Sequence, residues 1–255
     1  MRIIKFKYKD RAGWGVVEGL QARILAQPPF ERIKFSKQRV ALNKIKLLAP
    51  CLAGKIILCG LNYCKHAQEL GLAVPGEPVI FLKPASALLA HKQKIIYPPG
   101  VSRLDYEAEL ALVIKKPGRN IPANKAADFI LGFTCLNDVT ARGLQKKDGQ
   151  WTRSKSFDTF CPLGPWLETQ IEPGALNIRA YLNSKIVQDS NTADFIFPVD
   201  YLVSFISRVM TLLPGDVIST GTPAGIGPMQ PGDTIEIEIE GIGKLKNYLA
   251  KDRER

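Results

Sequence analysis

Short runs of apolar and β-branched residues recur along most of this chain, each closed by Pro, Gly or Asn, and they constrain its fold more than any other feature. Runs punctuated in this way are typical of β-strands. Beyond residue 50 the pattern predicts strands at 55–59, 79–82, 95–97, 107–114, 129–136, 176–182, 216–219 and 234–240. The last strand continues into a predicted hairpin, because a Gly241-Ile242-Gly243 turn separates it from a second run at 244–249.

Helical patterns are few. A helix is predicted at 199–210, where Pro198 precedes an apolar face made of Val199, Leu202, Val203, Ile206, Val209 and Met210. Shorter helices are predicted at 63–70 and 139–146. The chain shows neither internal repeats nor the alternation of strands and helices that builds a doubly wound sheet. The prediction is therefore an α+β fold dominated by β-structure.

The first segment differs from the rest in charge. Residues 1–46 contain 12 Lys/Arg against 3 Asp/Glu, a net charge of +9, whereas the remaining residues carry only +2. With strands predicted at 2–8, 14–18 and 22–25, we expect a small basic β-rich cap domain at 1–50 and a larger domain at 51–255. A basic patch can bind phosphates, but no recognition-helix pattern accompanies this one. A solvated face or a helper for anionic substrates is expected, and no nucleic-acid partner.

The compartment follows from what the sequence lacks. No stretch approaches the roughly 20 consecutive apolar residues of a membrane span, and the first residues alternate apolar with basic rather than forming the unbroken apolar run of a signal peptide. The five cysteines form no CxxC pair, and an odd number fits free thiols in a reducing compartment. We expect a cytoplasmic protein without a membrane partner.

An acidic pattern carries the chemistry. Glu107 and Glu109 share one face of the strand predicted at 107–114, together with Ala111 and Val113. One interpretation is a solvated strand edge. However, the polar face at 234–240 contains only Glu, as a water-facing strand should, whereas the face at 107–113 turns apolar. Two carboxylates that enter a partly buried face repel each other unless a cation neutralises them.

A third carboxylate, Asp138, stands where an apolar strand ends and a helix is predicted to begin. By itself it could be a helix N-cap. Together with Glu107 and Glu109 it would complete an all-oxygen site of charge −3, which suits Mg²⁺ or Mn²⁺, with Ca²⁺ as a third candidate. Zinc is not expected, because the chain has two His and no cysteine cluster with zinc spacing.

Six motifs, in order, give the chain a resemblance to the fumarylacetoacetate hydrolase family of metal-dependent enzymes over about residues 56–249. The motifs are Gly60-Leu-Asn-Tyr-Cys-Lys-His66-Ala-Gln-Glu69, Phe81-Leu-Lys-Pro84, Asp105-Tyr-Glu107-Ala-Glu109-Leu, Asn137-Asp138-Val-Thr-Ala-Arg142, Lys155-Ser-Phe-Asp158 and Thr220-Gly-Thr222-Pro. The resemblance implies a mixed β-sandwich roll, a homodimer, a catalytic domain at 51–255 and one divalent metal on Glu107, Glu109 and Asp138. The sequence departs from the family pattern at Gly143, where an acidic residue is usual, and at Lys115 and Lys116, where Gly is frequent.

Acid–base groups are expected at His66 and Glu69, which lie three residues apart and so share a helix face. A carboxylate beside an imidazole fixes its tautomer and raises its basicity, as a base that deprotonates water requires. The alternative is a solvated helix pair. The resemblance favours the dyad, carried by a lid for which the Gly- and Pro-rich stretch 71–78 would be the hinge.

The remaining site residues rest on the resemblance. It implies that Lys155 contacts substrate oxygens beside the metal, whereas a lone lysine is usually solvated. It assigns Arg142 and Gln145 to the substrate pocket, although Arg142 could equally be an ion-pair partner of the carboxylates. Thr222, in a loop that lacks the phosphate-binding pattern, is expected to hold a substrate carboxylate or carbonyl. Cys64, Cys135, Cys161 and His91 are expected to be packing or structural residues, His91 alternatively exposed.

The implied reaction is C–C bond cleavage in a 2-oxo acid or β-dicarbonyl substrate. The metal would chelate the 1-carboxylate and 2-oxo oxygens and stabilise an enolate, while His66 activates water for acylpyruvate- or fumarylacetoacetate-type hydrolysis. Oxaloacetate could lose CO₂ through the same enolate without water. The nearest alternative is an isomerase or decarboxylase acting on a 2-hydroxyhepta-2,4-diene-1,7-dioate-type substrate. A basic nucleic-acid-binding module, the alternative from another class, would explain residues 1–46 but not the acidic pattern.

Overall fold

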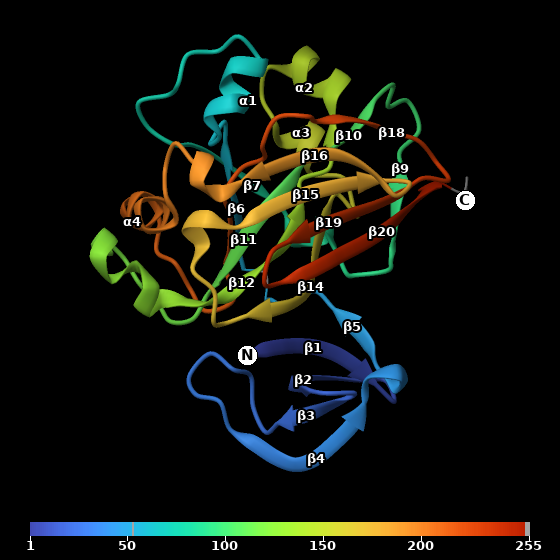
Figure 1. Cartoon of the computed structure of the whole chain (residues 1–255), viewed down its shortest axis with the longest axis vertical. Coiled ribbons are helices and arrows are strands. Elements are labelled where there is room, and N and C mark those ends of the chain that lie inside the picture. The colour runs from blue at the N-terminus through green and yellow to red at the C-terminus, as the bar shows by residue number, and fades with distance from the viewer. Residues whose placement is uncertain (53, 253–255) are drawn as a thin grey trace.

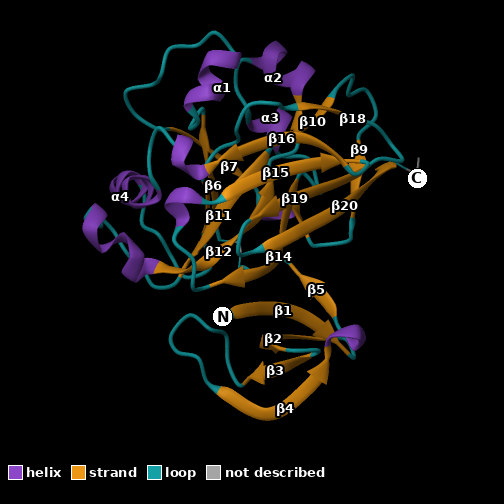
Figure 2. Cartoon of the chain, viewed as in Figure 1, coloured by secondary structure: helices purple, strands orange, loops and turns teal. Residues whose placement is uncertain are grey.

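The chain is described from a computed structural model that covers residues 1–52 and 54–252, and within them the strands form three β-sheets (Figures 1 and 2). The large sheet contains β1 (Arg2–Tyr8), β2 (Arg11–Glu18), β3 (Gln21–Leu25), β4 (Phe35–Ala41), β5 (Lys46–Leu48), β6 (Ile56–Gly60), β7 (Val79–Lys83), β8 (Leu88–Leu89), β11 (Ala108–Ile114), β12 (Ile130–Asn137), β14 (Cys161–Glu168) and β17 (Val217–Ser219). The second sheet contains β9 (Lys94–Tyr97), β15 (Asn177–Leu182), β16 (Lys185–Asn191), β19 (Thr234–Ile239) and β20 (Gly243–Lys251). The small third sheet contains β10 (Leu104–Tyr106), β13 (Thr140–Ala141) and β18 (Gly227–Met229).

The helices are short, and they lie around the sheets rather than between them (Figure 2). They are α1 (Cys64–Glu69), α2 (Arg142–Asp148), α3 (Thr152–Lys155) and α4 (Val199–Val209). 3₁₀ helices occur at Leu42–Lys44, Ala85–Ala87, Ala123–Phe129, Pro173–Ala175 and Thr192–Asp194. None of the helices described is long and apolar enough to cross a membrane.

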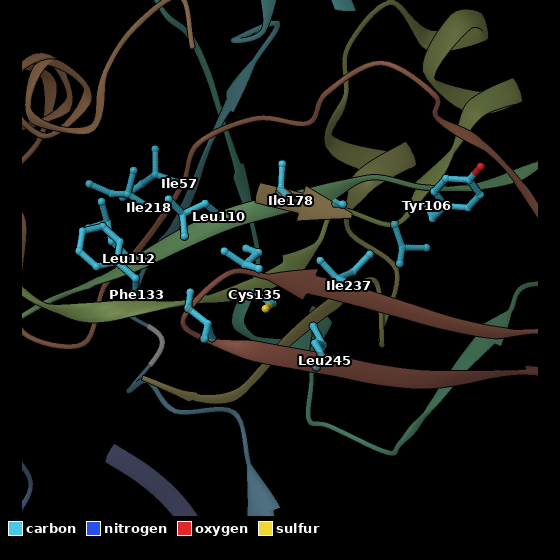
Figure 3. Packing of buried hydrophobic residues seen from close by; sticks show 14 of the residues in the cluster. Ile57, Tyr106, Leu110, Leu112, Phe133, Cys135, Ile178, Ile218, Ile237 and Leu245 are labelled. Carbon is cyan, nitrogen blue, oxygen red and sulfur yellow. The ribbon is translucent and has the colours of Figure 1, made fainter. Parts of the chain in front are cut away.

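The core lies between the large sheet and the second sheet, as Figure 3 shows. The order of the large sheet is β4-β3-β2-β1-β14-β12-β11-β17-β6-β7. From β11, Leu110 and Leu112 enter the same cluster as Ile178 on β15, Ile237 on β19 and Leu245 on β20. These alternate positions are buried because two apolar sheet faces exclude water from each other. The predicted β-dominated α+β sandwich is confirmed.

The N-terminal strands form a small β-domain that continues the large sheet (Figure 1). Strand β1 pairs with β14 in antiparallel register, Ile3 opposite Leu167. A second apolar cluster joins Trp14 and Phe30 of this domain to Ile56 and Leu163 of the larger body. The predicted small N-terminal β-domain is therefore present and shares both a sheet and a core with the rest of the chain.

Several predicted elements need correction. The helix predicted at 139–146 begins only at Arg142, because Thr140 and Ala141 pair with β10 as strand β13. On α4, Val199, Leu202, Val203 and Ile206 are buried as predicted, but Val209 is 53% exposed. Among the longer strands, the predictions omitted β4, β14 and β16, and they also lacked the short strands β5, β8, β10, β13 and β18. Strand β14 contains Pro162 and Pro165, residues that argue against a central strand although they occupy one here.

Candidate active site

Three carboxylates converge where the start of β11 adjoins the end of β12. The two strands are antiparallel with Ala108 opposite Asn137, so Glu107 and Asp138 lie at adjacent strand ends, and the Asp138 amide donates to the Glu107 carbonyl at 2.9 Å. One ligand atom from each of Glu107, Glu109 and Asp138 lies within 4.8 Å of the others. The side chains are buried, at 5%, 1% and 1% exposure. The solvated-edge interpretation of the glutamates is therefore wrong.

The N-cap interpretation of Asp138 is also wrong, because the N-cap of α2 is Ala141. Two lysines hold the Asp138 carboxylate instead. Lys155 Nζ donates to Asp138 Oδ2 and, at 2.8 Å, to Glu107 Oε2. Lys83 Nζ lies 2.7 Å from Asp138 Oδ1 and donates to the carbonyls of Val139 and Phe160. Both ammonium groups are buried, and each is paired with a carboxylate, as a buried cation requires.

Arg142 belongs to the same charge network. Its guanidinium donates to Glu107 Oε1, to Asp105 Oδ2 at 2.9 Å and to Gln145 Oε1 at 2.5 Å. Arg142 therefore forms the ion pair that was one of its two expected roles, with Glu107 and with Asp105, and Gln145 accepts a hydrogen bond from it. Arg142 and Gln145 nevertheless both line the same cavity as the carboxylates.

The two glutamates differ in their electrostatic surroundings. Burial alone would raise the pKa of Glu107, but Lys155 and Arg142 hold it at about 2. Burial, and then the charge of Asp138, raise the pKa of Glu109 well above its ordinary value. Its hydrogen-bond donors among the described residues are the Ser219 hydroxyl and the Gly221 amide, which carry no net charge. Without a cation, Glu109 therefore favours its protonated form, and a divalent cation such as Mg²⁺ or Mn²⁺, which the three hard oxygen ligands fit, would favour the ionised form.

The two residues predicted to form an acid–base pair are in contact. On α1, His66 Nδ1 lies 2.8 Å from Glu69 Oε2, and the other oxygen of Glu69 accepts from the Gly225 amide at 3.0 Å. His66 is buried and Glu69 is partly exposed, so the solvated-pair alternative does not describe His66. The pair therefore links α1 to the loop after β17.

A single cavity of about 550 Å³ joins these groups. All nine residues selected from the sequence line it, although they come from α1, the β11–β12 edge, α2, α3 and the loop after β17: His66, Glu69, Glu107, Glu109, Asp138, Arg142, Gln145, Lys155 and Thr222. Its walls also include the basic residues Arg103 and Lys146 and the apolar residues Leu61, Leu70, Leu72, Phe81, Trp151 and Ile226. Charged groups thus stand beside an apolar wall, an arrangement common in small-molecule sites.

Sequence reasoning missed several supporting residues. Lys83 and Asp105 lie within two of the six family motifs, and their place in those motifs could have identified them. Asn137 Oδ1 accepts from the Glu107 amide at 3.0 Å. Gln188 had no signal, because it is a lone amide on an unpredicted strand.

The chain is similar to known proteins over nearly its whole length. A model of the fumarylacetoacetate (FAA) hydrolase C-terminal domain matches residues 55–250, and a model of the Rv2993c-like N-terminal domain matches residues 1–50. Protein Rv2993c of Mycobacterium tuberculosis is 43% identical over an alignment of 261 positions, which covers 98% of this chain and 98% of its own length. Oxaloacetate tautomerase Fahd2a, mitochondrial, of Rattus norvegicus is 40% identical over 219 residues, 81% of this chain and 70% of its own length.

Solved structures agree with the fold. The crystal structure of 5-carboxymethyl-2-hydroxymuconate delta-isomerase from Mycobacterium smegmatis matches 99% of this chain and 100% of its own, with a TM-score of 0.94 and 42% identity. Maleylpyruvate hydrolase from Sphingobium sp. SYK-6, in complex with manganese(II) and pyruvate, has a TM-score of 0.84 and 29% identity over 99% of this chain and 100% of its own.

Proposed function

The chain belongs to the fumarylacetoacetate hydrolase family, and on this premise we propose that it is a divalent-metal-dependent enzyme that cleaves C–C bonds in 2-oxo acids bearing a second carbonyl or carboxylate. The observation that carries the proposal is the shared cavity, in which the Glu107–Glu109–Asp138 cluster and the His66–Glu69 pair face one space. Mg²⁺ or Mn²⁺ bound to the three carboxylates would polarise the carboxylate and 2-oxo oxygens of the substrate and stabilise the negative charge that develops on them. The manganese and pyruvate bound by the Sphingobium hydrolase support this assignment.

His66 is the proposed general base. Because Glu69 engages Nδ1, the proton of the neutral ring sits on Nδ1, and Nε2 is left to accept a proton from water. The resulting hydroxide adds to the distal carbonyl carbon. When the bond from that carbon to C3 breaks, its electron pair moves into the 2-oxo acid fragment, which then takes up a proton at C3. A general base of this kind contributes about 10²–10⁴-fold to the rate.

The basic and polar residues of the cavity bind and orient the substrate. Lys155 Nζ lies among the carboxylates and is the donor best placed for substrate oxygens beside the metal, and Thr222 Oγ1 offers a hydroxyl to the same cavity. Lys146 and Arg103 give the cavity further positive charge for a second carboxylate. The site therefore fits a dianionic substrate better than an uncharged one.

A second candidate uses less of this machinery. Tautomerisation moves a proton between C3 and the 2-oxo oxygen, and isomerisation removes a proton at one carbon of the conjugated chain and returns it at another. Neither reaction needs attack by water. The names of the Rattus tautomerase and the Mycobacterium smegmatis isomerase favour it. Decarboxylation of oxaloacetate is likewise independent of water.

The test assays one Mg²⁺- or Mn²⁺-loaded preparation on an acylpyruvate, on oxaloacetate and on a 2-hydroxy-dienedioate. C3 proton exchange is followed by NMR in D₂O beside product formation. We expect exchange with all 2-oxo acids and hydrolysis of the acylpyruvate, both abolished by chelation. Exchange without cleavage would support the isomerase candidate, and neither exchange nor turnover with any compound would refute the proposal. By light scattering we expect a homodimer, as the family resemblance implies.

A further inference from the structure

Gln188, on β16, is a buried amide that joins two separate parts of the cavity wall. The residue is 1% exposed. Its Oε1 accepts from the Ala108 amide at 3.0 Å, and its Nε2 donates to Thr222 Oγ1 at 3.0 Å and to the Pro223 carbonyl at 2.9 Å. One side chain thus spans from the start of β11 to the loop after β17.

Each end of this bridge adjoins a chemically important group. Ala108 stands between Glu107 and Glu109, so its backbone position sets where both carboxylates start. The loop that contains Thr222 continues to Gly225, whose amide holds Glu69 at 3.0 Å. At Gly225 the loop lies directly on β16, because an added Cβ would be 2.6 Å from the Val187 carbonyl oxygen.

The first residues of the loop, up to Gly221, are tied to β11 by strand pairing and by the bond from the Gly221 amide to Glu109. For the next three residues, Thr222 to Ala224, the hydrogen bonds found in the described part of the chain come from Gln188. Strand β16 pairs with β15 in the second sheet, whereas β11 pairs with β12 and β17 in the large sheet. Packing alone tolerates small sliding between sheets, but a bidentate buried amide does not, since losing either partner leaves a buried polar group unsatisfied.

We propose that Gln188 is a positioning residue that fixes the acidic cluster relative to the loop carrying Thr222 and anchoring Glu69. The proposal rests on the proposed function, in which the distance between the carboxylates and the His66–Glu69 pair decides hydrolysis. Misplacement of about 1 Å can reduce a rate by about 10²-fold. Steps that need the acidic cluster alone are insensitive to this distance.

The test compares Gln188→Met, which keeps length and volume but removes the amide, with Asn247→Leu as a matched control. Asn247 is equally buried and donates to the carbonyls of Ala90 and Gln93, outside the cavity. For Gln188→Met we expect the ratio of acylpyruvate hydrolysis to C3 proton exchange to fall about tenfold or more. For Asn247→Leu the ratio should stay within about twofold of wild type, whatever the loss of thermal stability. An unchanged ratio in Gln188→Met, or an equal fall in both variants, would overturn the proposal.

A second measurement does not depend on activity. Amide hydrogen–deuterium exchange, on protein without added metal, should speed up in peptides covering 219–227 and 107–110 in Gln188→Met but not in Asn247→Leu. Should Gln188→Met fail to fold, Gln188→Glu keeps an acceptor for Ala108 and loses the donor to Pro223, so faster exchange is expected at 219–227 alone. Unchanged exchange there contradicts the proposal. If wild type neither exchanges nor cleaves any 2-oxo acid, the proposed function fails, whereas deuterium exchange still decides the role of Gln188.

Discussion

At the scale of single residues, Glu109 carries the conflict between stability and metal binding. Its pKa is raised by burial and by the charge of Asp138, so the folded chain prefers the protonated form. The stability that this group contributes is fully present below its unfolded pKa and is lost as the pH rises through the folded value. At neutral pH, therefore, the ionised carboxylate opposes folding unless a cation compensates it.

The expected consequence is a reversal of stability in Glu109→Gln. In chelator the variant should unfold at a higher temperature than wild type at pH 7, because the amide is neutral. In Mg²⁺ the order should reverse, since wild type gains about 2.7 kcal/mol at a free concentration one hundred times Kd and the variant gains nothing. Thermal unfolding with calorimetric Mg²⁺ titration measures both. Wild-type Mg²⁺ affinity in the variant would contradict the metal site.

The two histidines allow a controlled test of the general base. His66→Ala should lower hydrolysis by about 10²–10⁴-fold and leave Mg²⁺ affinity unchanged, because the site uses oxygen ligands. His91→Ala is the control. Burial lowers the pKa of His91 to about 4, and its Nδ1 accepts from the Lys246 amide, away from the cavity. The test is the rate of hydrolysis by both variants. Normal hydrolysis in His66→Ala would show that His66 is not the general base.

The sequence predicted site residues where charge and spacing made a pattern. Glu107 with Glu109 and His66 with Glu69 are visible because alternate and three-residue spacings place side chains together. Lys83 and Gln188 could not be found in this way, since a lone polar residue in a strand has no periodic partner. Their partners, Asp138 and Ala108, are separated from them by 55 or more residues and meet them only in the folded chain.

At the scale of elements, the loop after β17 depends on Gly225. Its φ of +94° and the overlap of an added Cβ with the Val187 carbonyl both exclude a side chain. Gly225→Ala should therefore lower hydrolysis by about tenfold or more by displacing the amide that holds Glu69. Gly232, with a φ of +102° and no atom within 4 Å of an added Cβ, is the matched control. Both variants should lose about 1–2 kcal/mol of stability from the backbone, but Gly232→Ala should keep wild-type hydrolysis.

Helices and strands could be predicted where the pattern that defines them lies within a few consecutive residues. The hairpin of β19 and β20 and the helix α4 follow from alternation and from an apolar face, which the chain expresses over a few residues. Strand β14 does not, because Pro162, Gly164 and Pro165 each disfavour a strand, and its neighbours β1 and β12 supply the pairing. Tertiary pairing overrides local propensity there.

At the scale of the whole molecule, the N-terminal domain should unfold together with the rest. Ile3 is 1% exposed and shares a core cluster with Ile56, Leu163 and Val217. Ile3→Ala should cost about 2–5 kcal/mol and shift one cooperative transition by calorimetry. Leu20→Ala, at a residue 86% exposed, should change stability by less than about 0.5 kcal/mol. A separate low-temperature transition that alone responds to Ile3→Ala would show that the N-terminal domain unfolds independently.

The placement of the thiols makes the protein suited to site-specific labelling. Four of the five cysteines are buried, whereas Cys64 is partly exposed and begins α1, two residues before His66. A maleimide fluorophore should therefore attach at Cys64 in preference to the buried thiols, with Cys64→Ser as the unlabelled control. The emission of that dye would report on any movement of α1 as oxalate or a 2-oxo acid enters, so that ligand entry could be timed separately from bond cleavage.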